Sequence, residues 1–433
     1  MGIWSTAASL AAKTPPERNR YVDFLRAVSI LLVISGHWLI ATAWYQDGEL
    51  VIGDMLNIQP WTQWLSWLFQ VMPVFFIVGG YSNAVSLESA RRRNVAYAGW
   101  LTGRLFRLVS PLILLLVAWA LLTVALNVFG VKPANTRMAS QAALIPIWFL
   151  AIYTMVVMLA PLTYRLWRRW GYWSFAASAA VAVLVDVAFF AADLRWPGWS
   201  NYFWIWLAVH QLGYAWRDGR VGKPPMLMAC ALAALTVLLL MVLAGPYPIA
   251  MAGSPDESLS NTLPPKITLL ALGVTQFCLL LAGEKPVQRW LDRLGPWTAT
   301  VLINSMIMTI YLWHMTGMIV VVAVAYLAGG IGLTLEPGSP EWWWSRPLWI
   351  AFLAAILVPL ALVLSALERR SLPPDRPEPS TPRLIVGAMM ICLGVALTAS
   401  MGFDGVVDVA VDAGAFALVM VGALLSGLVT LRR

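Results

Sequence analysis

The sequence predicts an all-α, polytopic membrane protein, on three observations. Apolar residues make up 60% of the chain and charged residues 12%, with a mean hydropathy of +0.74, whereas about a quarter of the residues in soluble domains are charged. Apolar runs long enough to cross the roughly 30 Å hydrocarbon core recur along the chain. Basic residues gather in every second interval between these runs, so the net charge of +8 indicates membrane topology and no nucleic-acid partner.

Crossing a bilayer takes roughly 17 to 25 apolar residues, and twelve runs meet this length. The ninth is long enough to tilt or break. The runs are 22–45, 61–85, 108–129, 142–163, 172–192, 199–216, 226–245, 265–283, 297–328, 347–367, 384–402 and 410–431.

The basic residues predict the orientation of these runs. With a cytoplasmic amino terminus, 24 of the 29 lysines and arginines fall in inner segments, as short cytoplasmic loops require. We therefore expect both termini to be cytoplasmic. We interpret residues 1–20 as a polar segment without the apolar core of a secretory signal, so we expect no cleavable signal peptide. The five basic residues left outside are Lys132, Arg137, Arg195, Lys266 and Arg346.

A composition shift near the carboxyl end divides the chain. Residues 371–383, SLPPDRPEPSTPR, are too rich in proline to be helical throughout. We therefore predict a cytoplasmic segment over 1–20, a ten-helix membrane domain over 21–370, a cytoplasmic linker over 371–383 and two extra transmembrane helices over 384–433. The extra pair is expected to have a packing or partner role.

Ionisable groups inside apolar runs are functional candidates, because the bilayer makes them costly. The three histidines, His37, His210 and His314, all lie in such runs. A hydrogen bond between helices is the structural alternative for each. His210 lies toward the inner end of its run and is expected at the boundary, and Asp186 is expected to be neutral or paired. The chain has no HxxxH, HExxH or CxxC pattern, so we expect no metal site.

The first run carries the strongest pattern. Arg26 and His37 are eleven positions apart, about three helical turns, so they share one face at roughly 16 Å along the axis. A guanidinium at the membrane edge suits phosphate, and an imidazole near mid-membrane can take a proton from a hydroxyl or amine. An acyl-coenzyme A thioester fits both ends. Asp23 is placed to orient Arg26, or alternatively forms a boundary ion pair with it.

Two further groups accompany this pair. Tyr311 and His314 are three residues apart, which makes them neighbours on a helix, and they could supply a hydroxyl donor or a second imidazole to an acceptor. A basic cluster suits a polyanion such as the donor nucleotide, although phospholipid headgroups are the alternative. That cluster consists of Arg91, Arg92, Arg93, Arg104 and Arg107.

Five blocks in order resemble the acyltransferase-3 family of integral membrane acyltransferases, across roughly residues 18 to 367. They are RNRYVDFLRAVSILLVISGHW, VFFIVGGYSNA, RLFRLVSP, IWFLAIYTMVVMLAPL and SMIMTIYLWHMTG. The resemblance implies about ten membrane helices and transfer of an acyl group, usually acetyl from cytoplasmic acetyl-coenzyme A, to an envelope glycan, lipopolysaccharide or another lipid-linked or small acceptor. It implies that His37 is the catalytic histidine and Arg26 its donor-binding partner.

The chain departs from the family pattern in two ways. The family block often reads FFxxSG, but here Phe75-Phe76 is followed by Ile77-Val78-Gly79-Gly80, so that serine hydroxyl is missing. Some members also carry an esterase-like carboxy-terminal domain, and this chain has the extra helical pair in its place. We therefore expect transfer to the final acceptor to occur within the membrane domain.

The resulting hypothesis is an O-acyltransferase of the bacterial inner membrane. Acetyl-coenzyme A or another acyl-coenzyme A is the donor substrate, no cofactor is bound tightly, and the partners are an envelope glycan or glycolipid acceptor and membrane lipids. His37 acts as general base or itself accepts the acyl group. The alternative is a secondary transporter or lipid flippase with histidine proton relays; a scaffold protein would not explain an arginine and a histidine on one face.

Overall fold

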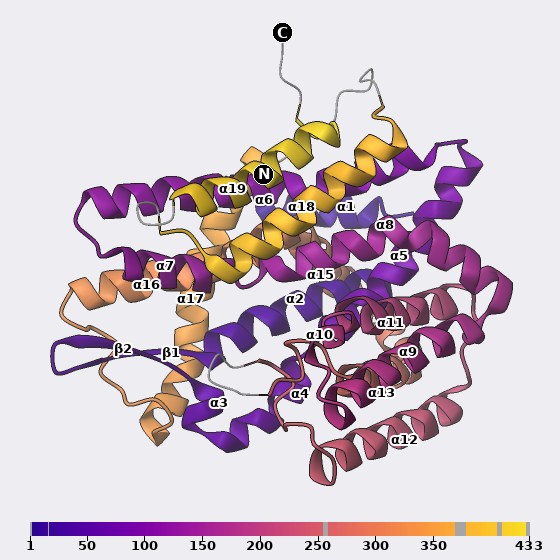
Figure 1. The fold of residues 1–433 in the computed structure, drawn as a ribbon, viewed down its shortest axis with the longest axis horizontal. Helices are drawn as coiled ribbons and strands as arrows, with labels where there is room; N and C mark the ends of the chain where they lie inside the picture. The colour runs from indigo at the N-terminus through magenta and orange to yellow at the C-terminus, as the bar shows by residue number, and fades with distance from the viewer. Residues whose placement is uncertain (1, 16, 254–258, 369–377, 405–408, 430–433) are drawn as a thin grey trace.

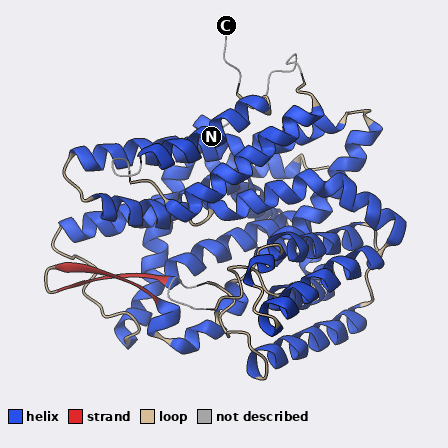
Figure 2. Cartoon of the chain, in the orientation of Figure 1, coloured by secondary structure: helices blue, strands red, loops and turns tan. Residues whose placement is uncertain are grey.

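The computed structural model confirms a helical protein with very little sheet (Figure 2). It describes residues 2–15, 17–253, 259–368, 378–404 and 409–429. Within these ranges nine helices are long and apolar enough to cross a membrane, or ten if α13 and α14, which meet at 56°, form one broken span. The expected number of twelve is therefore not reproduced in full.

The first half of the chain forms α1 (Ile3–Ala12), α2 (Arg20–Ile40), β1 (Ala41–Gln46), β2 (Glu49–Asp54), α3 (Met55–Ile58), η1 (Pro60–Trp64), α4 (Ser66–Phe69), α5 (Met72–Arg92), α6 (Tyr97–Val128), α7 (Pro133–Leu144), α8 (Ile147–Trp170), α9 (Tyr172–Ala191), α10 (Arg195–Gly198) and α11 (Asn201–Arg217). The second half forms α12 (Pro224–Leu243), α13 (Ile267–Ala282), α14 (Glu284–Leu291), α15 (Leu294–Ser305), α16 (Ile307–Leu327), α17 (Pro340–Glu368), α18 (Thr381–Met401) and α19 (Val409–Leu425).

The first expected run, 22–45, is too long at its carboxyl end, because residues from Ala41 onward form a β-hairpin. Strands β1 and β2 pair antiparallel, with Gln46 opposite Glu49. The two turn residues, Asp47 and Gly48, have φ values of 52° and 91°. An Asp-Gly pair tolerates such values, which give a two-residue turn whose twist matches the strands. The helix therefore ends at Ile40, three residues after His37.

Other runs differ from expectation in their ends. The second, 61–85, begins with the short elements η1 and α4 before α5, and the ninth, 297–328, breaks at Met306 between α15 and α16, as its length suggested. The runs at 199–216 and 410–431 form helices of 17 residues each, α11 and α19. In the expected linker, residues 371–377 lie outside the described residues, and α18 already begins at Thr381.

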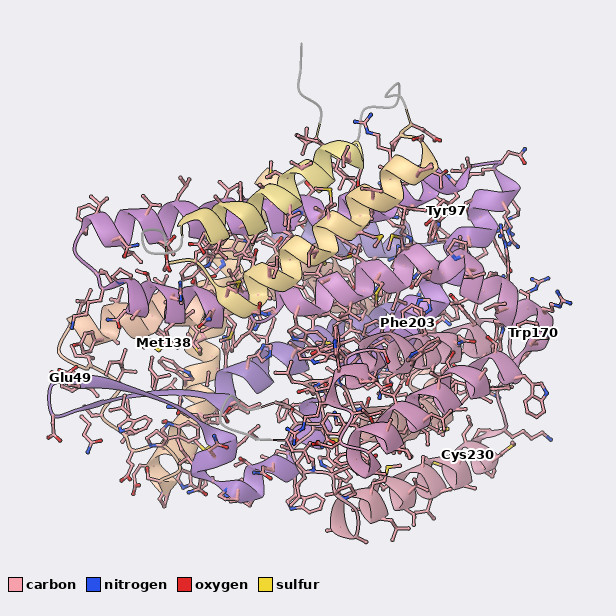
Figure 3. All side chains as sticks on the ribbon, in the orientation of Figure 1. Glu49, Tyr97, Met138, Trp170, Phe203 and Cys230 are labelled. Carbon is pink, nitrogen blue, oxygen red and sulfur yellow. The ribbon has the colours of Figure 1, made fainter. Side chains whose placement is uncertain are left out.

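The basic loops meet at one end of the helical bundle, which we call the basic end. Glu88 accepts a hydrogen bond from Tyr164 at 2.6 Å and pairs with Arg168 and Arg217, and Trp167 donates to Asp218 at 2.9 Å. The opposite end, which carries β1 and β2, is the hairpin end. In Figure 3, Glu49 of the hairpin and Met138 of α7 lie at the left, and Tyr97 and Trp170 lie at the right.

Glycines bring α5 and α11 into backbone contact. A Cβ at Gly80 would lie 1.9 Å from the carbonyl oxygen of His210, and one at Gly213 would lie 2.0 Å from that of Ile77. Both distances are far inside van der Waals contact, so any side chain would separate the two helices. Gly80 and Gly213 thus permit the close crossing of α5 and α11.

The last two helices pack on each other and on the rest of the bundle. A Cβ at Gly387 would meet the carbonyl oxygen of Gly422 at 2.7 Å, which shows that small residues permit the close crossing of α18 and α19. Helix α18 also packs along α8, and both yellow helices lie along the upper face of the molecule in Figure 1.

A buried polar cluster fixes the loop between α12 and α13 at the hairpin end. Asp186 is 2% exposed and accepts hydrogen bonds from Asn201 Nδ2 at 2.9 Å, Tyr247 Oη at 3.1 Å and the backbone N–H of Ile267 at 2.8 Å. Lys266, also buried, donates to the carbonyl oxygen of Pro264 at 3.2 Å. Burial lowers the pKa of Lys266, and nearby Asp186 opposes that shift. Asp186 is therefore held by hydrogen bonds from three neutral groups, which account for its burial.

We predict that Asp186→Ala destabilises the fold by roughly 3 kcal/mol, because three buried donors lose their acceptor. Thermal unfolding of the purified protein in detergent should show a midpoint several degrees lower. Asp292→Ala is the matched control, since the Asp292 side chain is 75% exposed and its backbone is helical, so its loss should shift stability by less than about 0.5 kcal/mol. Equal midpoints for the two variants would contradict the conclusion that this polar cluster stabilises the fold.

Candidate functional site

Arg26 and His37 project from one face of α2, as their spacing predicts. The helix begins after Asn19, whose side chain accepts the N–H groups of Tyr21 and Val22 at 3.0 and 3.2 Å. Eleven residues of helix separate the two side chains by roughly 16 Å along the axis. His37 lies in the last turn of α2, nearer the hairpin end than the mid-membrane position that we expected.

His37 meets His314 of α16. Nδ1 of His37 lies 2.8 Å from Nε2 of His314. The two ring planes are within 3° of parallel, and their centroids are 5.1 Å apart. A nitrogen-to-nitrogen distance so much shorter than the centroid distance means that the rings meet edge to edge, with one hydrogen bond between them. His314 is fully buried and His37 is partly buried.

The direction of this hydrogen bond follows from the group behind His314. Nδ1 of His314 lies 2.7 Å from the carbonyl oxygen of Tyr311, and a carbonyl oxygen can only accept, so this nitrogen carries a hydrogen. In a neutral ring the other nitrogen, Nε2, is then the acceptor. We therefore assign His37 Nδ1–H as the donor to His314, which leaves Nε2 of His37 as the basic nitrogen of the pair.

Tyr311 contributes its backbone to this arrangement rather than its hydroxyl. The Tyr311 hydroxyl donates to the carbonyl oxygen of Pro146 at 2.6 Å, at the junction of α7 and α8. Thus the structure places His37, His314 and Tyr311 together, but it directs the Tyr311 phenol away from the histidine pair.

Arg26 lies in a separate polar centre toward the basic end. Its Nη1 pairs with Asp23 Oδ1 at 3.1 Å, and its Nη2 donates to the hydroxyl of Ser82 at 3.0 Å. Asp23 is 5% exposed and also pairs with Arg18 at 2.5 Å. The carboxylate therefore holds one edge of the Arg26 guanidinium in place, a geometry that fits both alternatives, the orienting residue and the boundary ion pair.

Arg104 reaches the same serine from α6. Its Nη2 donates to the backbone carbonyl oxygen of Ser82 at 2.9 Å, and its guanidinium carbon lies 5.8 Å from the ring centre of Trp100. The buried Nε of Arg104 has no hydrogen-bond partner among the described residues. The guanidinium groups of Arg26 and Arg104 thus converge on Ser82. Asp23 supplies the single carboxylate beside them, so the pair retains positive charge and N–H groups that suit an anion.

The other arginines of the basic cluster lie farther out. Arg91, Arg92 and Arg93 are exposed at the end of α5, nine to eleven residues beyond Ser82, which is about 14 to 16 Å of helix. Arg107 is exposed one turn after Arg104. The structure therefore divides the expected cluster into the inner pair, Arg26 and Arg104, and an exposed outer group.

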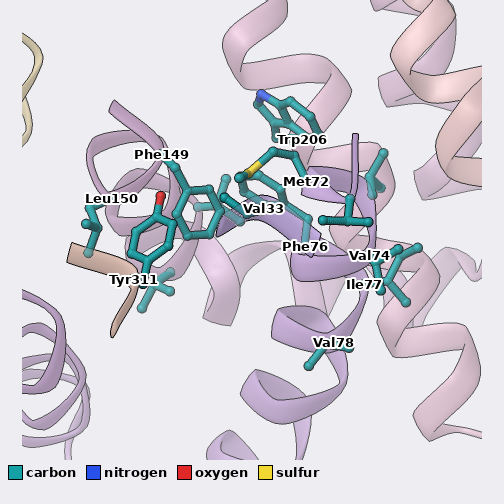
Figure 4. Packing of buried hydrophobic residues seen from close by; sticks show 14 of the residues in the cluster. Val33, Met72, Val74, Phe76, Ile77, Val78, Phe149, Leu150, Trp206 and Tyr311 are labelled. Atoms are coloured by element: carbon teal, nitrogen blue, oxygen red, sulfur yellow. The ribbon is translucent and has the colours of Figure 1, made fainter. Parts of the chain in front are cut away.

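Buried apolar side chains of α2, α5, α8 and α16 pack together in the core, among them Val33, Phe76, Phe149 and Tyr311 (Figure 4). Val33 of α2 lies on the face that carries Arg26 and His37. Phe149 of α8 lies edge-on to Phe76 and Tyr311, with ring centres 5.4 and 6.1 Å apart. On the face of α2, Val33 lies between Arg26 and His37.

Sequence reasoning missed two features of the region. Ser82, which joins the two arginines, follows the glycine pair by two residues, and that position near the basic end was the available signal. His210 was expected at the membrane boundary, but it is fully buried between α5 and α11, where its Nε2 lies 3.1 Å from the amide nitrogen of Asn83. The glycine contact at Gly80 explains this burial, because it draws α11 inward.

Within the described ranges, no three His, Cys, Asp or Glu side chains gather as metal ligands would. The chemical groups brought together are instead an imidazole with a free basic nitrogen and, three turns away, two guanidinium groups.

Comparison with known proteins identifies the family of the chain. The family model described as an acyltransferase domain matches residues 19–366, which include both centres and end just before the expected linker. No curated protein and no solved structure matches the chain. The chain belongs to the acyltransferase-3 family of membrane acyltransferases.

Proposed function

We propose that the protein moves an acyl group, most simply acetyl, from acyl-coenzyme A to a hydroxyl of an envelope glycan, glycolipid or lipid-linked sugar. The observation that carries this proposal is the pairing on one helix face of an arginine anion centre and a histidine whose Nε2 is free to act as a base. The protein would lie in the inner membrane, with the basic end and both termini cytoplasmic.

The donor enters from the basic end. Arg26 and Arg104 bind phosphate oxygens of the nucleotide, and Ser82 fixes the spacing between the two guanidinium groups. The outer arginines, Arg91, Arg92, Arg93 and Arg107, raise the local concentration of the polyanionic donor. The thin pantetheine arm follows the face of α2 past Val33 and carries the thioester to His37.

The acceptor approaches from the hairpin end, because His37 lies one turn from that end of α2. Nε2 of His37 takes the proton of the acceptor hydroxyl as its oxygen attacks the thioester carbonyl carbon. The carbon–sulfur bond then breaks, and the thiolate of coenzyme A takes the proton back from His37. The products are an O-acyl ester and free coenzyme A, so no other reactant is needed.

His314 stabilises the charged intermediate state of His37. When Nε2 of His37 is protonated, its Nδ1–H still donates to His314, and the positive charge is shared along the chain that ends at the Tyr311 carbonyl oxygen. A neutral imidazole thus occupies the position that a carboxylate holds behind the histidine of a serine hydrolase. It fixes the tautomer without placing a second full charge in the membrane.

We predict opposite kinetic signatures for the two centres. His37→Ala should lower kcat by at least about 10³-fold with donor affinity unchanged, because it removes the base. Arg26→Gln should weaken donor binding by about tenfold or more, because a charged hydrogen bond to phosphate is lost. The measurements are transfer of labelled acetyl groups from acetyl-coenzyme A to envelope glycolipid, and equilibrium binding of coenzyme A to the purified protein.

Arg195→Ala is the control, because its exposed side chain lies at the opposite end of the bundle, paired with Asp193. Its affinity and rate should equal those of the wild type. Transfer that survives in His37→Ala would refute the catalytic assignment. Label that accumulates on the protein without acceptor would identify His37 as an acyl carrier instead of a base. Proton-coupled transport without coenzyme A binding would instead support the transporter alternative.

His314 should affect kcat and leave donor binding unchanged. His314→Leu removes the acceptor for His37 Nδ1–H and should lower kcat by about 10² to 10⁴-fold, the range seen when a catalytic histidine loses its orienting partner. His314→Gln retains an acceptor oxygen and should recover part of the rate. A His314→Leu variant with the wild-type kcat would show that the histidine pair has no catalytic role.

A further inference from the structure

The last two helices lie beyond residue 366, where the match to the family ends, so family membership assigns them no role. The turn that follows α18 does not face open solvent. Phe403 and Asp404 are 2% and 1% exposed. They lie against α7, the short helix that leads into α8.

The contacts between this turn and α7 are specific and polar. The Ser140 hydroxyl accepts the Phe403 N–H at 2.7 Å and lies 2.9 Å from the Phe403 carbonyl oxygen. Arg137 forms an ion pair with Asp404. A Cβ at Gly402, where φ is +67°, would lie 2.7 Å from the Ser140 hydroxyl oxygen, so the turn fits closely against α7 because residue 402 is glycine.

A second contact joins α18 to the first turns of α8. Cys392 of α18 donates to the carbonyl oxygen of Ala151 at 3.3 Å. The segment from Ser140 to Ala151 is thus held at both ends by residues of α18 and its turn. Ile147, at the first position of α8, is fully buried, so this segment has little freedom to shift.

Pro146 lies in the middle of that held segment, and its carbonyl oxygen accepts the Tyr311 hydroxyl at 2.6 Å. The Tyr311 backbone carbonyl in turn accepts the Nδ1–H of His314. The series consists of the hydrogen bonds and the ion pair that join the turn to α7, the backbone from Ser140 to Pro146, and the hydrogen bonds of Tyr311 to Pro146 and to His314. A shift of α7 would therefore move the carbonyl that sets the orientation of His314.

We propose that helices α18 and α19 position the histidine pair. They do so by fixing α7 through the contacts of Ser140 and Asp404. The proposal rests on the proposed acyl transfer at His37. It makes Ser140 and Asp404 positioning residues, because neither touches His37 or His314. It also explains why Asp404, in the turn that follows α18, is a buried charged residue paired with Arg137 of α7.

The test compares full-length Ser140→Ala and Asp404→Asn with Ser400→Ala. Ser400 is the matched control, since its exposed hydroxyl bonds the carbonyl oxygen of Leu397 within its own helix. The first two variants should lower kcat by roughly tenfold or more, as small misplacements at a reacting centre do, with coenzyme A affinity within twofold of the wild type. Ser400→Ala should match the wild type in both.

A double variant of Ser140 and Tyr311 distinguishes positioning of the histidine pair from general destabilisation of the fold. Tyr311→Phe removes the link to Pro146 and should also lower kcat, and the double variant Ser140→Ala/Tyr311→Phe should fall no further, because both changes break one series of contacts. Multiplied losses, or wild-type kcat in both Ser140→Ala and Asp404→Asn, would overturn the proposal. So would a loss of coenzyme A affinity that parallels the loss of kcat.

A spectroscopic arm separates this proposal from the proposed function. The chain has three histidines, so the ring ¹⁵N resonances of a histidine-labelled protein in lipid can be assigned with single substitutions. The His314 resonances should shift in Ser140→Ala and stay in place in Ser400→Ala. If they do not shift in Ser140→Ala, the positioning role is refuted. If the wild type transfers no acyl group, the proposed function fails, and this measurement still decides the positional claim.

Discussion

The histidine site depends on one hydrogen bond, from His314 Nδ1–H to the carbonyl oxygen of Tyr311. Because a carbonyl oxygen accepts and never donates, this contact fixes the tautomer of His314 and, through the 2.8 Å contact between the rings, that of His37. The nitrogen of the pair that remains free to accept a proton is then Nε2 of His37. The surrounding fold can be understood as the structure that keeps Tyr311, His314 and His37 in this order inside a medium where an unpaired polar group is costly.

The second constraint is the distance along α2 between the charged arginine centre and the histidine pair. The guanidinium groups of Arg26 and Arg104 meet at Ser82, close to the basic end, where water and lipid headgroups are near. The histidine pair lies about three turns away, toward the hairpin end. A ligand that reaches both must have an anionic head and a narrow arm, which is why an acyl-coenzyme A fits better than a compact substrate. The glycine contact of Gly80 with α11 holds α5, and therefore Ser82, against the bundle.

Much of this was predictable from sequence, because membrane insertion imposes strong and local rules. Run length and basic loops predict helices and their alternation, and the spacing of Arg26 and His37 places both on one face. The β-hairpin was missed although Asp47-Gly48 is a known turn signal, because residues 38–45 continue the apolar run of α2 without a charged residue. The contacts of His37 with His314 and of Arg104 with Ser82 join residues 277 and 22 positions apart, and periodicity within one helix carries no information on which helices become neighbours. Ser140 and Asp404 were unpredictable for the same reason.

The most direct test of this hydrogen-bond order is the tautomeric state of the two histidines in the wild-type protein, measured by solid-state ¹⁵N magnetic resonance in lipid bilayers. We predict that His37 and His314 both carry hydrogen on Nδ1 at neutral pH, with a coupling between Nδ1 of His37 and Nε2 of His314 across their hydrogen bond. A hydrogen on Nε2 of His314, or the absence of that coupling in protein that is active, would refute the assigned order.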